Sequence, residues 1–592
     1  MAFYRDVLSF YAFFYPYTHL TIEETLSKHY KFFNQHKFLL QFVSTALAYI
    51  TISFMLIINI IHLVKDCVIV QLNSCNKIEL NTSLNRIGTK MLVYKNIITC
   101  VKVFIKEMLT THTFLKDHKL LLNILSTIFA CLTLFLLAPI ILICLIKNNL
   151  IKLFLKLRYD EKYENVSGMD SYFECTKNQA FFVNIVEHSG SIEELQIIIK
   201  KSTSHLLQSH YKFSSTIHNI FGVYYYLKNQ VFLNDVFSIE NIDVSSKDLL
   251  KNYMEKHCFS DFDDKSLWKV ILFETAIKWN EMDNSKTYYA ILIRFNHCLG
   301  DAIALSMYLQ QYFYNNVKSK YLEKLRNNTE SKDVFNRSNL GSVLFAGPKL
   351  NYTEINLFPS HQKLAVFMEH EPKYIRLIKY ISKQLNCSFT DVIIICAMSS
   401  ITNYLNMEGV KTTNFIVSNT SRPRLGDNIN LILEQKELSN NFTMEAFNLP
   451  LKHQNILIKF KEILPILRDG RNSDTGQIIY WIIKLLSNLH PKLLRKFARL
   501  NSEGATLGIT NIPFADYCKI GTSTVQNMFT IPNNFENTKF VMVVATFQDK
   551  LQTALITKKN LKVSREELQE ILNNCFLNID RLYEEVKLNE IK

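Results

Sequence analysis

The sequence has little glycine and proline, with 14 and 11 residues among 592, which excludes collagen-like chains and Pro/Gly-rich disorder. It has no Cys-x-x-Cys pair. Its twelve cysteines are scattered singly, so no zinc-binding or thioredoxin-like motif is indicated, and we expect no metal site. No zinc-finger, RNA-recognition or helix-turn-helix pattern accompanies the formal net charge of +14, so we expect no nucleic-acid partner. The positive surplus fits a solvated lysine-rich surface, an anionic membrane face or an anionic cofactor.

Acidic and basic residues are absent from two long apolar runs, residues 38–64 and 120–146. Each run has 27 residues, more than the roughly 20 that cross a bilayer as a helix, so both are predicted to be transmembrane. The first run starts too far along the chain, and is too long, for the apolar core of a signal peptide. We therefore expect a tail over residues 1–37, a membrane region with its connecting loop over 38–146, and a body long enough for two domains.

The basic linker at residues 147–164 follows the second run directly and decides the expected orientation. By the positive-inside rule it places the N-terminus and the catalytic region in the cytosol. We expect an integral membrane protein, and we expect the membrane to be that of the endoplasmic reticulum. The loop between the runs holds nine Lys and Arg, which opposes this orientation, and the sequon Asn81-Thr82-Ser83, which suits a lumenal loop. Within the linker, NNLIKLFLKL (148–157) suits either a helix on an anionic membrane surface or the flank of the second span.

Beyond residue 165, helical and strand-like patterns are mixed without strict alternation, which predicts an α/β or α+β body. The last predicted helix opens with a Ser-x-x-Glu capping box at Ser564. The predicted strands are 288–297, 415–421 and a pair within 539–557, and the predicted helices are 192–208, 304–317, two within 373–405, and 564–586.

One predicted strand ends in FNHCLGDA, which leaves His297 and Asp301 four residues apart beside a loop. Histidine takes up and returns protons near neutral pH, so His297 suits a general base. Asp301 would order the loop, for instance through an ion pair with Arg294 or Arg422. Cys298 should face away from His297 on an extended strand, so we interpret it as a packing residue. Because no Gly-x-Ser-x-Gly elbow occurs, the pattern predicts base catalysis without a covalent enzyme intermediate, although taken alone it equally fits a coincidence.

The stretch NHCLGDA (296–302) resembles the HHxxxDG motif of the wax ester synthase/diacylglycerol acyltransferase family, which has a chloramphenicol-acetyltransferase-like fold. Further stretches resemble family motifs in the same order along the chain: SLW at 266–268, TD at 390–391, SRP at 421–423, NNFTMEAFNLPL at 440–451 and NIP at 511–513. The chain departs from the family pattern at Ser266, Asn296, Ala302 and Thr390.

The resemblance implies two chloramphenicol-acetyltransferase-like subdomains that form a central channel. The N-terminal subdomain (165–365) would carry the motif, and the C-terminal one would span 366–592. It also implies His297 as general base, Asp301 as an orienting residue, acyl-CoA as co-substrate with no bound cofactor, and a long-chain alcohol or diacylglycerol from the lipid bilayer as acceptor. The candidates for substrate binding or for stabilising the oxyanion are Asn296, Thr390, Asn511, Arg422 and Trp268.

Several of these positions keep an alternative interpretation. Trp268 equally suits the core, Asn511 a turn, and Asp391 the negative charge at a helix start. Residues 478–500 suit either a helix pressed onto the bilayer or a packed internal helix. The departures from the family pattern also leave open a catalytically impaired lipid-binding membrane protein that retains the fold.

Overall fold

The computed structural model describes residues 146–592 except 167–168, 221, 259–264, 280–281, 320–361, 410–413, 422–437, 452–454, 473–475, 477–479, 481–494, 496–504, 533–537, 558–560 and 591–592. The chain divides into two compact units between Lys147 and Asn148. The predicted tail, connecting loop and transmembrane runs, apart from residue 146, lie outside the described residues, as do Arg422 and most of residues 478–500.

Within these described ranges, no single helix is both long and apolar enough to cross a membrane. One bent pair, Tyr374–Gln384 and Phe389–Met407, meets the two criteria when its helices are taken together across a bend of 105°.

A seven-stranded sheet carries the predicted catalytic strand, β7. Along β7, Ile291 and Ile293 enter one buried cluster while Ala290 and Leu292 enter another, because alternate side chains leave opposite faces of a strand. Both faces of the sheet are therefore buried at β7, which explains the unbroken apolar run of this strand. In sheet order the strands are β5 (Phe237–Glu240), β6 (Trp268–Phe273), β7 (Tyr288–Asn296), β2 (Gln179–Glu187), β14 (Ser523–Pro532), β13 (Tyr517–Ile520) and β8 (Asn315–Lys318).

Helices cover both faces of this sheet. Ile199 and Leu206 of α8 join the cluster on one face, and Leu250 and Tyr253 of α10 join the cluster on the other. The helices of this part are α7 (Met169–Thr176), α8 (Ile192–Ser209), η2 (Tyr211–Ser214), α9 (Leu233–Val236), α10 (Lys247–Tyr253), η3 (Met254–Cys258), α11 (Ala302–Tyr308) and η4 (Leu309–Phe313).

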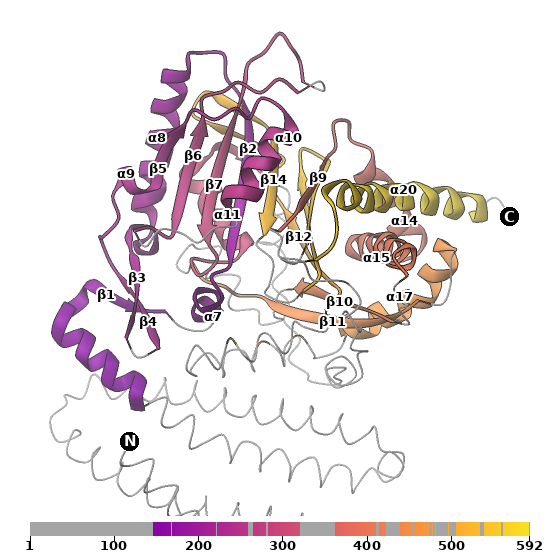
Figure 1. The fold of residues 1–592 in the computed structure, drawn as a ribbon, viewed down its shortest axis with the longest axis horizontal. Helices are drawn as coiled ribbons and strands as arrows, with labels where there is room; N and C mark the ends of the chain where they lie inside the picture. Colours follow the sequence, from indigo (N-terminus) through magenta and orange to yellow (C-terminus); the bar gives the residue numbers. More distant parts are fainter. Residues whose placement is uncertain are drawn as a thin grey trace, which may run out of the picture. The chain divides into compact units, whose positions relative to one another are not determined.

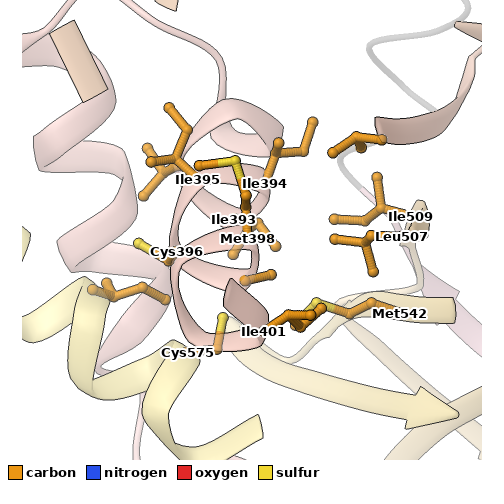
Figure 2. Packing of buried hydrophobic residues seen from close by; sticks show 14 of the residues in the cluster. Ile393, Ile394, Ile395, Cys396, Met398, Ile401, Leu507, Ile509, Met542 and Cys575 are labelled. Atoms are coloured by element: carbon orange, nitrogen blue, oxygen red, sulfur yellow. The ribbon is translucent and has the colours of Figure 1, made fainter. Parts of the chain in front are cut away.

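Among the described residues, a six-stranded sheet and four helices form the second large core. Figure 2 shows α15 at its centre, with Leu507, Ile509 and Met542 of the sheet on one side and Cys575 of α20 on another. In sheet order the strands are β11 (Thr443–Pro450), β10 (Asn414–Ser421), β12 (Leu507–Pro513), β15 (Phe540–Phe547), β16 (Lys550–Thr557) and β9 (Leu364–Met368). The helices are α14 (Tyr374–Gln384), α15 (Phe389–Met407), α17 (Ile456–Asn472) and α20 (Arg565–Glu590).

The two large sheets do not divide at one point of the chain. Strands β13 and β14 lie after residue 366 in the sequence but belong to the seven-stranded sheet, where β14 pairs antiparallel with β2. The expected boundary between residues 365 and 366 therefore does not separate the sheets. The prediction of a mixed α/β body is confirmed, and this body contains two large sheets.

A small third sheet lies beside the first. Its order is β1 (Tyr163–Asn165), β4 (Val223–Leu227) and β3 (Thr216–Ile220), preceded along the chain by the short η1 (Asp160–Lys162). A helix over residues 146–159 leads into this sheet and lies next to β1 in Figure 1.

Candidate active site

His297 lies in the turn that follows β7, at the end of the strand as the sequence predicts. Leu299 N donates to Asn296 O at 3.1 Å and closes the turn. On one side, Asn296 N donates to Leu267 O at 2.7 Å, and on the other, His297 N donates to Asn178 O at 2.8 Å. Because Leu267 and Asn178 adjoin the two strands that flank β7, the sheet fixes the backbone of His297 from both sides. As a whole residue, His297 is neither fully buried nor exposed.

A single side chain determines which nitrogen of His297 carries the proton. Asn440 Nδ2 donates to Asp170 Oδ1 at 2.9 Å and to His297 O at 2.6 Å, which orients the amide. Asn440 Oδ1 therefore faces His297 Nδ1 at 2.9 Å, and an amide oxygen can only accept. The proton of the neutral ring must lie on Nδ1, so Nε2 holds the lone pair.

Asn440 is held in turn by a buried ion pair. Asp170 Oδ1 accepts from Asn440 N at 3.0 Å, and Asp170 Oδ2 lies 2.6 Å from Lys212 Nζ. Lys212 Nζ also donates to Leu299 O at 3.3 Å and to Leu438 O. Each of the three ammonium donors thus has an acceptor, which a buried cation requires. The pair joins α7, η2, the catalytic turn and the segment before β11.

The surroundings of the ring favour neutral imidazole. Phe173 stacks on it with ring centroids 3.9 Å apart and an interplanar angle of 18°. Burial lowers the pKa of His297 below its ordinary value, although its own backbone, Asp301, Asn440 and Asp170 oppose this. A lowered pKa keeps the ring unprotonated near neutral pH, which is the form a general base needs.

Asp301 fixes the start of α11. Its Oδ1 accepts from Ile303 N at 3.0 Å and Ala304 N at 2.9 Å, so it is the N-cap of that helix. Its Oδ2 accepts from Asn441 N at 2.9 Å. Backbone amides therefore satisfy this carboxylate, and the expected ion pair with Arg294 is not found among the described residues. Asp301 and Asn440 tie the two ends of the catalytic turn to the same stretch of chain.

Two neighbours of His297 act in the structure of the turn. Asn296 is buried, donating to Glu174 Oε2 at 2.9 Å and accepting from Cys298 N at 3.0 Å, so both ends of its amide are used within the protein. Burial raises the pKa of Cys298 well above its ordinary value, which keeps the thiol protonated and agrees with a packing role.

Trp268 is a core residue. It is 0% exposed, and its Nε1 donates to Phe213 O at 2.8 Å. Its ring stacks on Phe295 with centroids 6.2 Å apart. Nothing of the side chain reaches the surface. Of the two interpretations, the structure therefore favours a core residue over a substrate-binding residue.

Thr390 and Asn511, from distant parts of the sequence, are brought together. Asn511 Nδ2 on β12 lies 3.5 Å from Thr390 Oγ1 in the first turn of α15, at the limit of a hydrogen bond. Asn511 Oδ1 is buried and has no partner within the described part of the chain. Asp391 is a helix-start residue, since it completes a capping box with Ser388 and pairs with Arg471. Thr390 and Asn511 therefore remain a pair of polar groups with unused hydrogen-bonding capacity.

The sequence does not point to the residues that orient His297. Asn440 stands only within a stretch that resembles a family motif, and no pattern in the sequence singles out Asp170 or Lys212. Because they lie far apart in the sequence, no local spacing links them to His297. The one available signal was that Asn440 opens the stretch that resembles a family motif.

Comparisons with known proteins give the fold. No protein-family profile matches the sequence, and no curated protein matches it. The structure is similar to the trichothecene 15-O-acetyltransferase of Fusarium sporotrichioides, with a TM-score of 0.52 at 9% identity over 71% of this chain and 95% of that one. A wax ester synthase/diacylglycerol acyltransferase of Marinobacter aquaeolei VT8 matches with a TM-score of 0.49 at 12% identity, over 72% of this chain and 100% of that one. The first likeness shows that the chain has the fold of an acetyltransferase.

Proposed function

We propose that this chain is a membrane-bound O-acyltransferase that transfers a fatty acyl group from acyl-CoA to a long-chain alcohol or diacylglycerol, with His297 as general base. The observation that carries the proposal is the hydrogen bond from His297 Nδ1 to Asn440 Oδ1 at 2.9 Å. It leaves the lone pair of the neutral ring on Nε2, where it can take a proton. A fold shared with an O-acetyltransferase supports this reading.

The reaction follows from that nitrogen. Nε2 takes the proton of the acceptor hydroxyl while the hydroxyl oxygen forms a bond to the thioester carbonyl carbon. The tetrahedral intermediate then collapses, the carbon–sulfur bond breaks, and the CoA thiolate takes the proton back from the imidazolium. General-base catalysis of this kind contributes roughly 10²–10⁴ to the rate. No covalent bond to the enzyme is needed.

The intermediate carries a negative oxygen that needs donors. Of the candidates, Asn296 and Trp268 use their donors within the protein. The Thr390 hydroxyl and Asn511 Nδ2 are therefore the donors that we assign to the oxyanion, because they lie together. Arg422 lies outside the described residues. We assign it, together with the surplus of basic residues, to binding the phosphates of CoA.

Membrane attachment completes the proposal. The two uncharged runs would anchor the chain in the endoplasmic reticulum, and the basic flank after the second would keep the catalytic body in the cytosol, where acyl-CoA is available. Protease protection of the C-terminal body in sealed microsomes tests this orientation, since a protected body would contradict it.

Two departures from the family motif fit an active enzyme as well as an impaired lipid-binding protein. Asn296 makes two hydrogen bonds that hold the turn. Ala302 is the first residue of α11, where an ordinary helical backbone suits alanine and no glycine is required. Neither departure disturbs the contacts of His297.

A transfer assay tests the proposal. Full-length protein in detergent receives labelled palmitoyl-CoA with hexadecanol or diacylglycerol, beside His297→Ala and the control His205→Ala, which changes an exposed histidine of α8. We expect ester from the parent and the control, and a loss of roughly 10²–10⁴ in His297→Ala. The absence of ester from the parent with both acceptors contradicts the enzyme, and equal rates in all three contradict the role of His297.

A further inference from the structure

The helix over residues 146–159 exposes large apolar side chains along one side. Leu150, Leu153 and Leu157 are 62%, 56% and 81% exposed, and Phe154 between them is 46% exposed. Spacings of three, four and seven residues bring these side chains onto one stripe of the helix. A surface helix ordinarily presents polar residues to water, so this stripe indicates a partner.

The other side of the same helix is seated on the body. Ile151 and Leu155 are buried and pack against Tyr225 of β4. Tyr163 of β1 also donates its hydroxyl to Lys152 O at 3.2 Å. The helix therefore has two apolar sides, one packed against Tyr225 of the β1–β4–β3 sheet and one exposed. Figure 1 shows the helix next to β1.

Cations flank the exposed stripe. At 100° per residue, Lys152 and Lys156 project between the seated side and one border of the stripe, and Arg158 lies toward the other border. All three side chains are exposed. An apolar stripe bordered by basic residues is typical of helices that lie in the interface of an anionic bilayer.

We propose that residues 148–158 dock the catalytic body on an anionic membrane surface, with Leu150, Leu153, Phe154 and Leu157 immersed among the acyl chains. Two observations favour a bilayer over a protein partner. The flanking cations complement anionic lipid headgroups, and the uncharged run that ends at residue 146 leads directly into the helix. The sequence left open whether this segment lies on the membrane or only flanks a span, and the seated helix with its free apolar side favours the first.

The seat of the helix connects it to the catalytic turn. Tyr225 and Tyr226 are neighbours on β4, so their side chains leave opposite faces of the strand. Tyr225 packs against the docking helix, whereas the Tyr226 hydroxyl donates to Cys298 O at 3.0 Å, one residue after His297. A single strand thus separates the docking helix from the turn, and docking would hold His297 next to the layer that contains lipid substrates. This second step rests on the proposed function.

Tryptophan fluorescence tests the docking without any catalytic readout. Full-length Leu157→Trp protein is reconstituted into bilayers of phosphatidylcholine with phosphatidylserine, in which the phosphatidylcholine carries bromine on its acyl chains. The matched control is Ile197→Trp. Ile197 is an apolar residue of α8 whose exposed fraction is 69%. Helix α8 begins after the end of β2 that lies away from His297. The unsubstituted chain supplies the background of the native tryptophans.

We expect bromolipid to quench the added tryptophan at position 157 and not the one at 197. Lys152→Gln, Lys156→Gln and Arg158→Gln, added together to Leu157→Trp, should lower the ratio of docked to undocked protein by roughly fivefold per charge in anionic bilayers. Quenching at 157 no stronger than at 197 overturns the proposal. So does a blue-shifted but unquenched tryptophan at 157, which would mean that protein covers the stripe. If quenching at 157 is equally strong in bilayers without phosphatidylserine, the proposal that the membrane surface must be anionic is overturned.

A second variant separates docking from catalysis. Leu153→Ser with Leu157→Ser should lower transfer to hexadecanol embedded in bilayers and leave transfer to a short, water-soluble alcohol unchanged. Equal loss with both acceptors contradicts the link between docking and lipid delivery. Absence of transfer in the parent contradicts the proposed function but leaves the fluorescence result valid.

Discussion

The turn that carries His297 and the pair formed by Thr390 and Asn511 differ in how fully their polar groups are used. Around His297, the side chains of Asp170, Lys212, Asn440 and Asp301 all find partners, and the result is one defined tautomer. Thr390 and Asn511 share one contact of 3.5 Å, and Asn511 Oδ1 is a buried acceptor with no partner within the described residues. The groups around His297 therefore hold its ring in one arrangement, whereas Thr390 and Asn511 leave hydrogen-bonding capacity unused.

The largest effect should come from breaking the buried pair beneath the turn. Lys212→Met leaves the Asp170 carboxylate buried without its cation, and removing one partner of such a pair destabilises a protein by about 3–5 kcal/mol. Thermal unfolding followed by circular dichroism measures the loss. Adding Asp170→Asn to Lys212→Met should restore part of the stability, because no charge is then left unpaired. A double variant no more stable than Lys212→Met would show that the pair does not act as a unit.

Removing the less organised donors should affect the reaction more than the fold. If Thr390 and Asn511 stabilise the oxyanion, Thr390→Val or Asn511→Ala should lower kcat by roughly 10²–10³ with little change in KM. Thr390→Ser keeps the hydroxyl and is the matched control. Steady-state kinetics with palmitoyl-CoA measure the split. An unchanged kcat in both variants would mean that the oxyanion donors lie elsewhere.

The tautomer should respond to a change at Asn440. In the parent, burial lowers the pKa of His297, so activity should rise with pH through a midpoint below the ordinary histidine value and then level off. Asn440→Asp places a carboxylate beside Nδ1 and should raise this pKa, so the midpoint should move to higher pH and the loss should be greatest in acid. Asn440→Ala should lose part of the roughly 10²–10⁴ of base catalysis at every pH.

The pH dependence of His297 modification by diethyl pyrocarbonate, read by mass spectrometry, gives the same pKa without catalysis. The reagent attacks unprotonated imidazole, so reaction in Asn440→Asp should begin at higher pH than in the parent. Identical modification curves would contradict the assigned contact.

The smallest effect should come from restoring a residue of the family pattern. Ala302→Gly places glycine in the first turn of α11 and should destabilise the protein by about 0.5–1 kcal/mol. The transfer rate should not change, because Ala302 contributes no side-chain polar group to the turn. A faster enzyme would show that the departure at this position restrains catalysis.

Local patterns predicted much of the fold. The capping box at Ser564 is present, with Glu567 N donating to Ser564 Oγ at 3.0 Å, and it opens α20. The apolar run of β7 and the period of α8 gave boundaries within one or two residues. In each case, neighbouring residues alone determine the structure.

Pairing between distant segments explains the features that the sequence does not predict. Residues 304–317 were predicted to be one helix, but the helical part ends at Phe313, and Asn315–Lys318 form β8 because they pair with β13. The environment of His297 cannot be predicted from local patterns for the same reason. Asp170 and Asn440 are 270 residues apart and are joined by hydrogen bonds that no local spacing encodes.

The pairing of β2 with β14 has a consequence for the synthesis of this protein. Residue 187 of β2 pairs with residue 524 of β14. One edge of β2 therefore stays unpaired until residues far along the chain have been synthesised. While the ribosome makes the intervening residues, β2 presents an unpaired edge that other chains can join. We therefore expect nascent chains that stop before β14 to aggregate or to depend on chaperones, and the half that carries His297 to be inactive when produced alone.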